Sequence, residues 1–129
     1  MQVDTREEEA ALIDIQIVTS IFFIISIVIT IFLNLNEKDK LLYNDPFWDN
    51  KTASAILKRN RLLLFILFAV YLYVNLQQRE YDRINNKDLT PDNLEIFVSV
   101  LTIIGALIIL YEVFAYSGSD EASYDNPAI

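Results

Sequence analysis

Three long apolar segments, each flanked by charged residues, dominate the pattern of this chain. They cover residues 10–35, 62–76 and 94–116. A membrane hydrocarbon core of about 30 Å is crossed by roughly 20 apolar residues in a helix. The first and third segments reach that length, and a helix lets a segment satisfy its own backbone groups in lipid. The pattern therefore predicts an all-α membrane protein.

We expect three transmembrane helices in a small bundle, within a single integral membrane domain that covers residues 1–129. Its expected parts, in chain order, are a polar tail at 1–9, a first span at 10–35, an interfacial loop at 36–51, a helix at 52–84 that contains the second span, a third span at 91–116 and a disordered acidic tail at 117–129.

The second span is the shortest of the three. Its apolar run of 15 residues, 62–76, measures about 22 Å at 1.5 Å per residue. It crosses a bilayer if Arg61 snorkels at one end and Asn75 lies in the opposite interface. No helix-breaking residue appears before Asn85, so this helix should extend beyond the membrane, with a solvated face at 77–83.

Local signals mark two helix boundaries. Asn44, Asp45 and Pro46 favour a turn within the first loop. Thr90 is a good N-cap residue, and Pro91 suits the first position of a helix. These residues predict the start of the third helix.

Small and polar residues gather on one face of the first and third helices when they are spaced at 100° per residue. On the first helix the face holds Gln16, Thr19, Ser20, Ser26, Thr30 and Asn34. On the third it holds Glu95, Ser99, Thr102, Gly105, Ala106 and Glu112. Such residues allow close helix approach and interhelical hydrogen bonds, so we interpret both faces as packing surfaces. The alternative is that they line a wet path through an assembly of several copies.

Charged residues near the ends of the spans are further candidates. Asp14 and Glu112 are carboxylates inside the apolar limits, where an ionisable group is a functional candidate. The expected topology places them near opposite membrane surfaces, so they should not pair within one chain. Lys58, Arg59 and Arg61 could contact the headgroups of anionic lipids, or could act only as a topology signal.

Composition excludes several classes of function. The chain has no Cys and no His, which removes thiolate and imidazole chemistry and most transition-metal sites. No nucleophile with a base, metal cluster or glycine-rich phosphate loop is present, so we expect no enzymatic activity, no cofactor and no metal. The net charge of −8 argues against nucleic acid as a partner.

Basic residues flanking the spans predict the orientation. The first loop and the C-terminal side hold six, namely Lys38, Lys40, Lys51, Lys58, Arg59 and Arg61. The N-terminal side and the second loop hold four, namely Arg6, Arg79, Arg83 and Lys87. Because basic residues near helix ends favour the cytoplasm, we expect a multi-pass protein with its N-terminus outside and its C-terminus cytoplasmic.

Two functions fit these features. The first is a structural or accessory subunit that packs against the lipid bilayer and against other membrane subunits or copies of itself. The second is a homo-oligomeric pore or ion channel. The size, span count and orientation resemble those of phage holins of the three-span kind, an analogy of architecture alone. Many holins end in a basic tail, however, whereas residues 117–129 are acidic.

Overall fold

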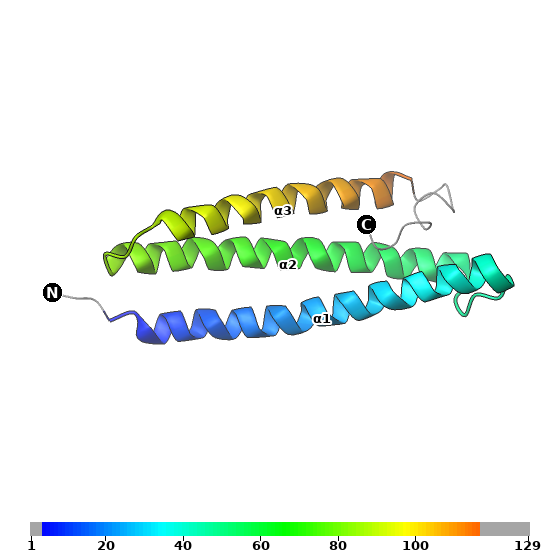
Figure 1. Ribbon diagram of the computed structural model, residues 1–129, viewed down its shortest axis with the longest axis horizontal. Coiled ribbons are helices and arrows are strands. Elements are labelled where there is room, and N and C mark those ends of the chain that lie inside the picture. Colours follow the sequence, from blue (N-terminus) through cyan, green and yellow to red (C-terminus); the bar gives the residue numbers. More distant parts are fainter. Residues whose placement is uncertain (1–3, 117–129) are drawn as a thin grey trace.

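The computed structural model describes residues 4–116, and these form helices joined by two short connections (Figure 1). The helices are α1, Arg6–Tyr43; α2, Asn50–Ile84; and α3, Thr90–Ala115. No strand occurs among the described residues. The helical class predicted from the sequence is therefore confirmed, while the acidic tail predicted at 117–129 lies outside the described residues.

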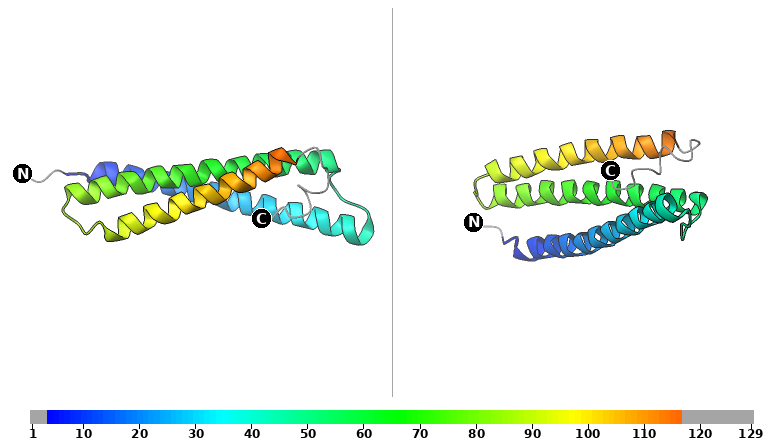
Figure 2. Two further views of the ribbon diagram at one scale, coloured as in Figure 1. Left: turned by 90° about the horizontal axis from the view of Figure 1, so that it is seen from above. Right: turned by 45° about the vertical axis from the view of Figure 1, so that its right-hand side comes forward.

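The three helices lie side by side in one layer, with α2 in the middle and running opposite to both α1 and α3 (Figures 1 and 2). Both α1 and α3 pack against α2, and within residues 4–116 the backbones of α1 and α3 do not approach within 8 Å of each other. Most packing between the described helices therefore involves α2. One end of the layer gathers the start of α1, the end of α2 and the start of α3, and the other end carries the α1–α2 connection.

Most buried positions in each helix recur every seven residues. Thr5, the N-cap of α1, is followed in this repeat by Leu12, Thr19, Ser26 and Leu33; on α2 the repeat is Ala53, Asn60, Leu67 and Val74; on α3 it is Asp92, Ser99, Ala106 and Val113. The buried Asn36, Glu37, Leu57 and Arg61 lie outside the repeat. A seven-residue repeat keeps one narrow seam facing a neighbouring helix along its length, as in left-handed coiled coils. The seam explains how helices this long stay in contact while burying few residues each.

The first helix is longer than the sequence led us to expect, because it begins at Arg6 and continues to Tyr43. Residues 6–9 of the expected polar tail are helical, as are 36–43 and 50–51 of the expected loop. Lys, Glu and Leu are good helix formers, and no Gly or Pro precedes Pro46. The helix is followed by its C-cap Asn44, whose positive φ of 52° is the left-handed conformation that Asn tolerates.

A small apolar core fixes this end of the layer. Leu33 of α1, Ala53 and Leu57 of α2 and Val113 of α3 form one buried cluster, with Trp48 packed against it. The backbone N–H of Trp48 donates a 2.8 Å hydrogen bond to Oδ1 of the buried Asn36. This bond ties the turn back onto α1, which explains why a polar residue is buried beyond the apolar segment.

Two aspartates that the sequence reasoning overlooked precede α2 and α3. Asp49 is the N-cap of α2 and accepts a 2.6 Å hydrogen bond from the backbone N–H of Thr52. Asp88 accepts a 3.0 Å bond from the backbone N–H of Thr90, which is the first helical residue of α3 and not its N-cap. The side chain and backbone N–H of Thr52 lower the pKa of Asp49, and the backbone N–H and side chain of Thr90 lower that of Asp88, because hydrogen bonds to a carboxylate favour its charged form.

Two of the described helices, α1 and α3, are long and apolar enough to cross a membrane. Within the most apolar 18 residues of each helix, only 11% of α1 and 17% of α3 is buried. The core helix of a soluble protein would be mostly buried. Their outer faces expose large apolar side chains, among them Ile24, Ile27, Phe97, Leu101 and Ile108. The fold thus presents a broad apolar surface on both sides of α2.

Candidate functional site: polar contacts along the central helix

Asn60 of α2 forms the most deeply buried polar contact of the layer. Its side chain is 2% exposed, and that of Ser26 on α1 is 1% exposed. The Ser26 hydroxyl donates a 2.7 Å hydrogen bond to Asn60 Oδ1, and Asn60 Nδ2 donates a 3.1 Å bond to Thr30 Oγ1. Thr30 Oγ1 in turn donates to the Ser26 carbonyl at 3.0 Å. The oxygen and the nitrogen of the Asn60 amide are therefore both hydrogen-bonded to residues of the polar face of α1.

Two further contacts continue this pattern along α2. Asn75 Nδ2 donates a 2.5 Å hydrogen bond to Ser99 Oγ of α3. Tyr71 shares a 3.1 Å hydrogen bond between its hydroxyl and that of Ser20 on α1, and its ring lies 5.2 Å from that of Phe23. The central helix thus supplies a hydrogen-bonding partner for polar residues of both neighbours.

The predicted packing residues divide into two groups. Thr19, Ser26, Ser99 and Ala106 are buried in the seams, whereas Gln16, Thr30, Thr102 and Gly105 are half-buried beside them. The hydroxyls of Thr19 and Thr102 donate to carbonyls one turn earlier in their own helices, at 2.7 Å each. Because α2 separates the two predicted faces, they meet α2 and not each other.

Gly105 does not make the close contact that its size suggested. A Cβ atom added at this position would meet no atom within 4 Å. The close approach of α3 to α2 occurs instead at the neighbouring Ala106, which is buried. Gly105 faces a hollow between the two helices that Arg61, Leu64 and Phe68 also line.

The three predicted lipid-contacting cations differ in environment. Arg59 is exposed, Lys58 is half-buried, and Arg61 is buried at 6% exposure. Lys58 Nζ lies 5.9 Å from the ring centroid of Phe114 on α3, within cation–π range. The Glu112 carboxylate attracts the Arg61 guanidinium electrostatically. Both cations therefore face the C-terminal part of α3.

The two predicted intramembrane carboxylates are far apart, as expected. Asp14 lies on the N-terminal half of α1, where it lines a hollow beside Phe22 and Leu67. Glu112 lies near the C-terminal end of α3, within electrostatic range of Arg61. Because α1 and α3 run in the same direction, the start of α1 and the end of α3 lie at opposite ends of the layer, so Asp14 and Glu112 do not pair within one chain.

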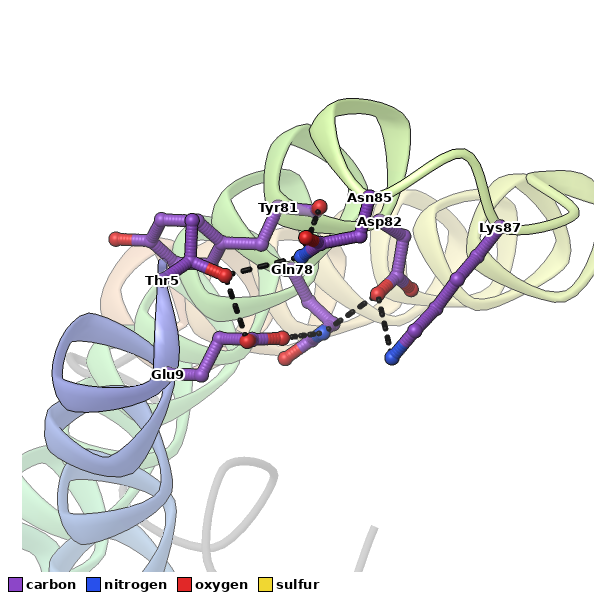
Figure 3. Close-up of polar contacts among 7 residues, drawn as sticks. All are labelled: Thr5, Glu9, Gln78, Tyr81, Asp82, Asn85 and Lys87. Carbon is purple, nitrogen blue, oxygen red and sulfur yellow. Dashed lines mark hydrogen bonds and ion pairs between the residues drawn. The ribbon is translucent and has the colours of Figure 1, made fainter. Parts of the chain in front are cut away.

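A polar network joins the start of α1 to the end of α2 (Figure 3). Gln78 Nε2 donates to Glu9 Oε1 at 3.2 Å and to Asp82 Oδ1 at 3.0 Å. Asn85 Nδ2 donates a 2.9 Å bond to Oγ1 of the buried Thr5. The expected solvated face at 77–83 is thus only partly correct, because Gln78 and Asp82 are half-buried in this network.

Sequence reasoning missed the roles of Asn60, Tyr71 and Asn75. Asn75 was expected in the membrane interface, and Asn60 was not considered. A signal was present, since Asn60, Leu67 and Val74 are spaced seven residues apart, like the polar and apolar positions of α1. A search for that period would have placed Asn60 on the contact face of α2.

The described residues offer no recognisable reactive centre. Within residues 4–116, no group of three or more His, Cys, Asp or Glu side chains is placed to hold a metal ion. Comparisons of the chain with protein-family models, curated protein sequences and solved structures found no match.

Proposed function

We propose that this chain is a non-enzymatic structural or accessory subunit of a larger membrane assembly, and that all three of its helices cross the bilayer. The observation that supports this most directly is that polar side chains of α1 and α3 are hydrogen-bonded toward α2, while large apolar side chains face outward. That is the arrangement a helical protein needs when lipid is its solvent.

The position of α2 supports its inclusion among the spans. Its apolar run, residues 62–76, lies between two helices that are long enough to cross a membrane. Of the polar residues near its ends, Asn75 is hydrogen-bonded to Ser99 of α3, and Arg61 lies within electrostatic range of Glu112. Neighbours of this kind reduce the cost of placing a short, partly polar helix in lipid.

We further propose that the N-terminus is outside and the C-terminus is cytoplasmic, as the distribution of basic residues favours. The lipid bilayer and other membrane subunits, or further copies of the chain, are then its partners. The exposed outer faces of α1 and α3 provide surface for such subunits. No nucleic acid or cofactor is part of this proposal.

Paired substitutions at Thr30 distinguish a dry scaffold from a homo-oligomeric pore. Thr30→Val keeps the side-chain shape and loses the acceptor for Asn60, a bond worth roughly 0.6 kcal/mol on average in a membrane. We expect this variant to fold and to assemble. Thr30→Lys places an amine beside Asn60 in a dry seam and should fail to assemble, as judged by size-exclusion chromatography in mild detergent. An assembled Thr30→Lys protein that conducts anions in planar bilayers would contradict the scaffold and favour the pore.

A further inference from the structure

Two adjoining hollows form a groove that runs along α2 beside α3. One hollow, of about 280 Å³, begins at Arg61 and is lined by Leu64, Phe68 and Gly105. The second, of about 380 Å³, extends to Asn75, shares Phe68 and Thr102 with the first and is also lined by Phe23 of α1. The groove therefore follows α2 from Arg61 to Asn75, which is about 21 Å of helix at 1.5 Å per residue.

The charges at one end of the groove are mainly positive. Lys58 and Arg61 lie one helical turn apart on the face of α2 that meets α3. Glu112 attracts Arg61, so among the described residues the charges at this end are those of Lys58, Arg61 and Glu112. Beyond Arg61 the walls are chiefly apolar, with the hydroxyl of Thr102 already bonded to its own helix. The groove thus combines a cationic mouth with an apolar interior.

We propose that this groove binds one acyl chain of an anionic phospholipid, with the lipid phosphate held by Lys58 and Arg61 at the mouth. The proposal rests on the proposed placement of the chain in a bilayer. In that placement Arg61 marks the end of the apolar run of α2, which is the level of the lipid headgroups. The mouth also lies on the side proposed as cytoplasmic, where basic pockets between membrane helices bind anionic headgroups.

The size of the groove favours an acyl chain over another helix. The two hollows have volumes near the lower end of the range for small-molecule pockets, about 300–1,000 Å³. A helix with its side chains is about 10–12 Å wide and would need far more room. An acyl chain is narrow and apolar, like the interior of the groove, and its phosphate complements the two cations.

Fluorescence quenching in vesicles tests where the lipid binds. Trp48 is the only tryptophan, so Trp48→Phe provides a silent background. In this background, Phe68→Trp reports on the groove and Leu101→Trp reports on the outer face of α3 at a similar depth. The vesicles consist of unlabelled phosphatidylcholine with a small fraction of a lipid that is brominated on its acyl chain. This brominated lipid is either phosphatidylglycerol or phosphatidylcholine.

We expect brominated phosphatidylglycerol to quench the Phe68→Trp reporter more strongly than brominated phosphatidylcholine, and both lipids to quench the Leu101→Trp reporter equally. Equal quenching of the Phe68→Trp reporter by both lipids would overturn the groove proposal and leave the membrane placement intact. Absence of quenching of both reporters by either lipid would overturn the membrane placement itself, and the groove proposal with it.

Charge-matched variants test the role of the mouth. Lys58→Gln and Arg61→Gln should each lower the preference for phosphatidylglycerol about fivefold, the factor expected for one basic residue near an anionic surface. Arg59→Gln removes the same charge from an exposed neighbour outside the groove and should lower the preference less than either of these variants. An equal loss in all three variants would indicate attraction to the whole surface and would overturn the site. Lys58 is half-buried, so its variant remains informative if Arg61→Gln fails to fold.

Filling the groove provides a test that leaves its charges in place. A side chain at Gly105 would extend into open space, so Gly105→Leu should fold and occupy the hollow beside Arg61. We expect this variant to lose the selective quenching of the Phe68→Trp reporter. A folded Gly105→Leu protein that keeps the full phosphatidylglycerol preference would show that the acyl chain does not lie in the groove.

Discussion

The hydroxyl of Ser26 and the amide of Asn60 form a 2.7 Å hydrogen bond between α1 and α2, and both side chains are almost fully buried. Ser26→Ala removes the donor and leaves Asn60 Oδ1 in a dry seam. We expect a loss of about 0.6 kcal/mol in the free energy of unfolding, and up to about 1.7 kcal/mol, the range measured for such bonds in a membrane protein. Thermal unfolding in detergent would measure it. Ile27→Val, on the exposed neighbouring position, should be nearly neutral.

Adjacent positions on α3 should respond oppositely to added volume. Ala106 is buried against α2, so Ala106→Leu should overpack the seam and cost about 1–3 kcal/mol in the free energy of unfolding. Gly105→Leu meets open space and replaces a poor helix former, so the stability should be unchanged or higher. Melting temperatures of the two variants provide the comparison. A lower melting temperature for Gly105→Leu than for Ala106→Leu would contradict the packing described.

Single cysteines can test the proposed topology, since the chain has none of its own. The Asn85–Thr5 hydrogen bond places the start of α1 and the end of α2 at the same end of the layer. An impermeant thiol reagent should therefore label Glu8→Cys and Lys87→Cys in intact cells, and Asp45→Cys only after permeabilisation. Labelling of Asp45→Cys alone in intact cells would show that the orientation is the reverse of the proposed one, with three spans retained. Labelling of all three in intact cells would contradict the proposed spans.

The cap of α2 should depend on pH. Because hydrogen bonds from the side chain and the backbone N–H of Thr52 lower the pKa of Asp49, the stability from this cap is complete above the ordinary carboxyl pKa. It is then lost as the pH falls through the lowered value. Asp49→Ala should remove this stability at neutral pH, whereas Asp49→Asn should retain the cap and remove its acid dependence. Unfolding followed by circular dichroism across the acid range would measure both effects. Equal acid sensitivity in the wild-type and Asp49→Asn proteins would contradict the proposed acid dependence of the cap.

The sequence was sufficient to predict the number of helices and their approximate positions. Apolar length indicated α1 and α3, and the scarcity of Gly and Pro indicated that α2 is long. The extension of α1 through Asn36 to Tyr43 was not predicted, because polarity was taken to mark a loop. In the structure, Asn36 is buried and accepts a hydrogen bond from the turn, which local polarity does not reveal.

The polar faces of α1 and α3 could be located from helical spacing, but their partner could not. Ser26 and Ser99 indicated packing surfaces, or the lining of a path through an assembly of several copies, without saying which helix they meet. The structure places Asn60 and Asn75 of α2 between them. Spacing along one helix fixes which residues share a face, whereas the order of helices in space depends on packing between segments far apart in the chain. The same limitation explains why Gly105 was expected at a contact and Ala106 provides it.

The central position of α2 has a consequence for how the protein is made. On the proposed placement in a bilayer, α2 enters the membrane beside α1 before α3 is made, because segments emerge from the ribosome in chain order. Ser26 and Thr30 are then available to Asn60, but Ser99, the partner of Asn75, is not yet present. A nascent chain that stops before Leu89 would hold Asn75 without its α3 partner. On this proposal, synthesis of the last helix completes the insertion of the second.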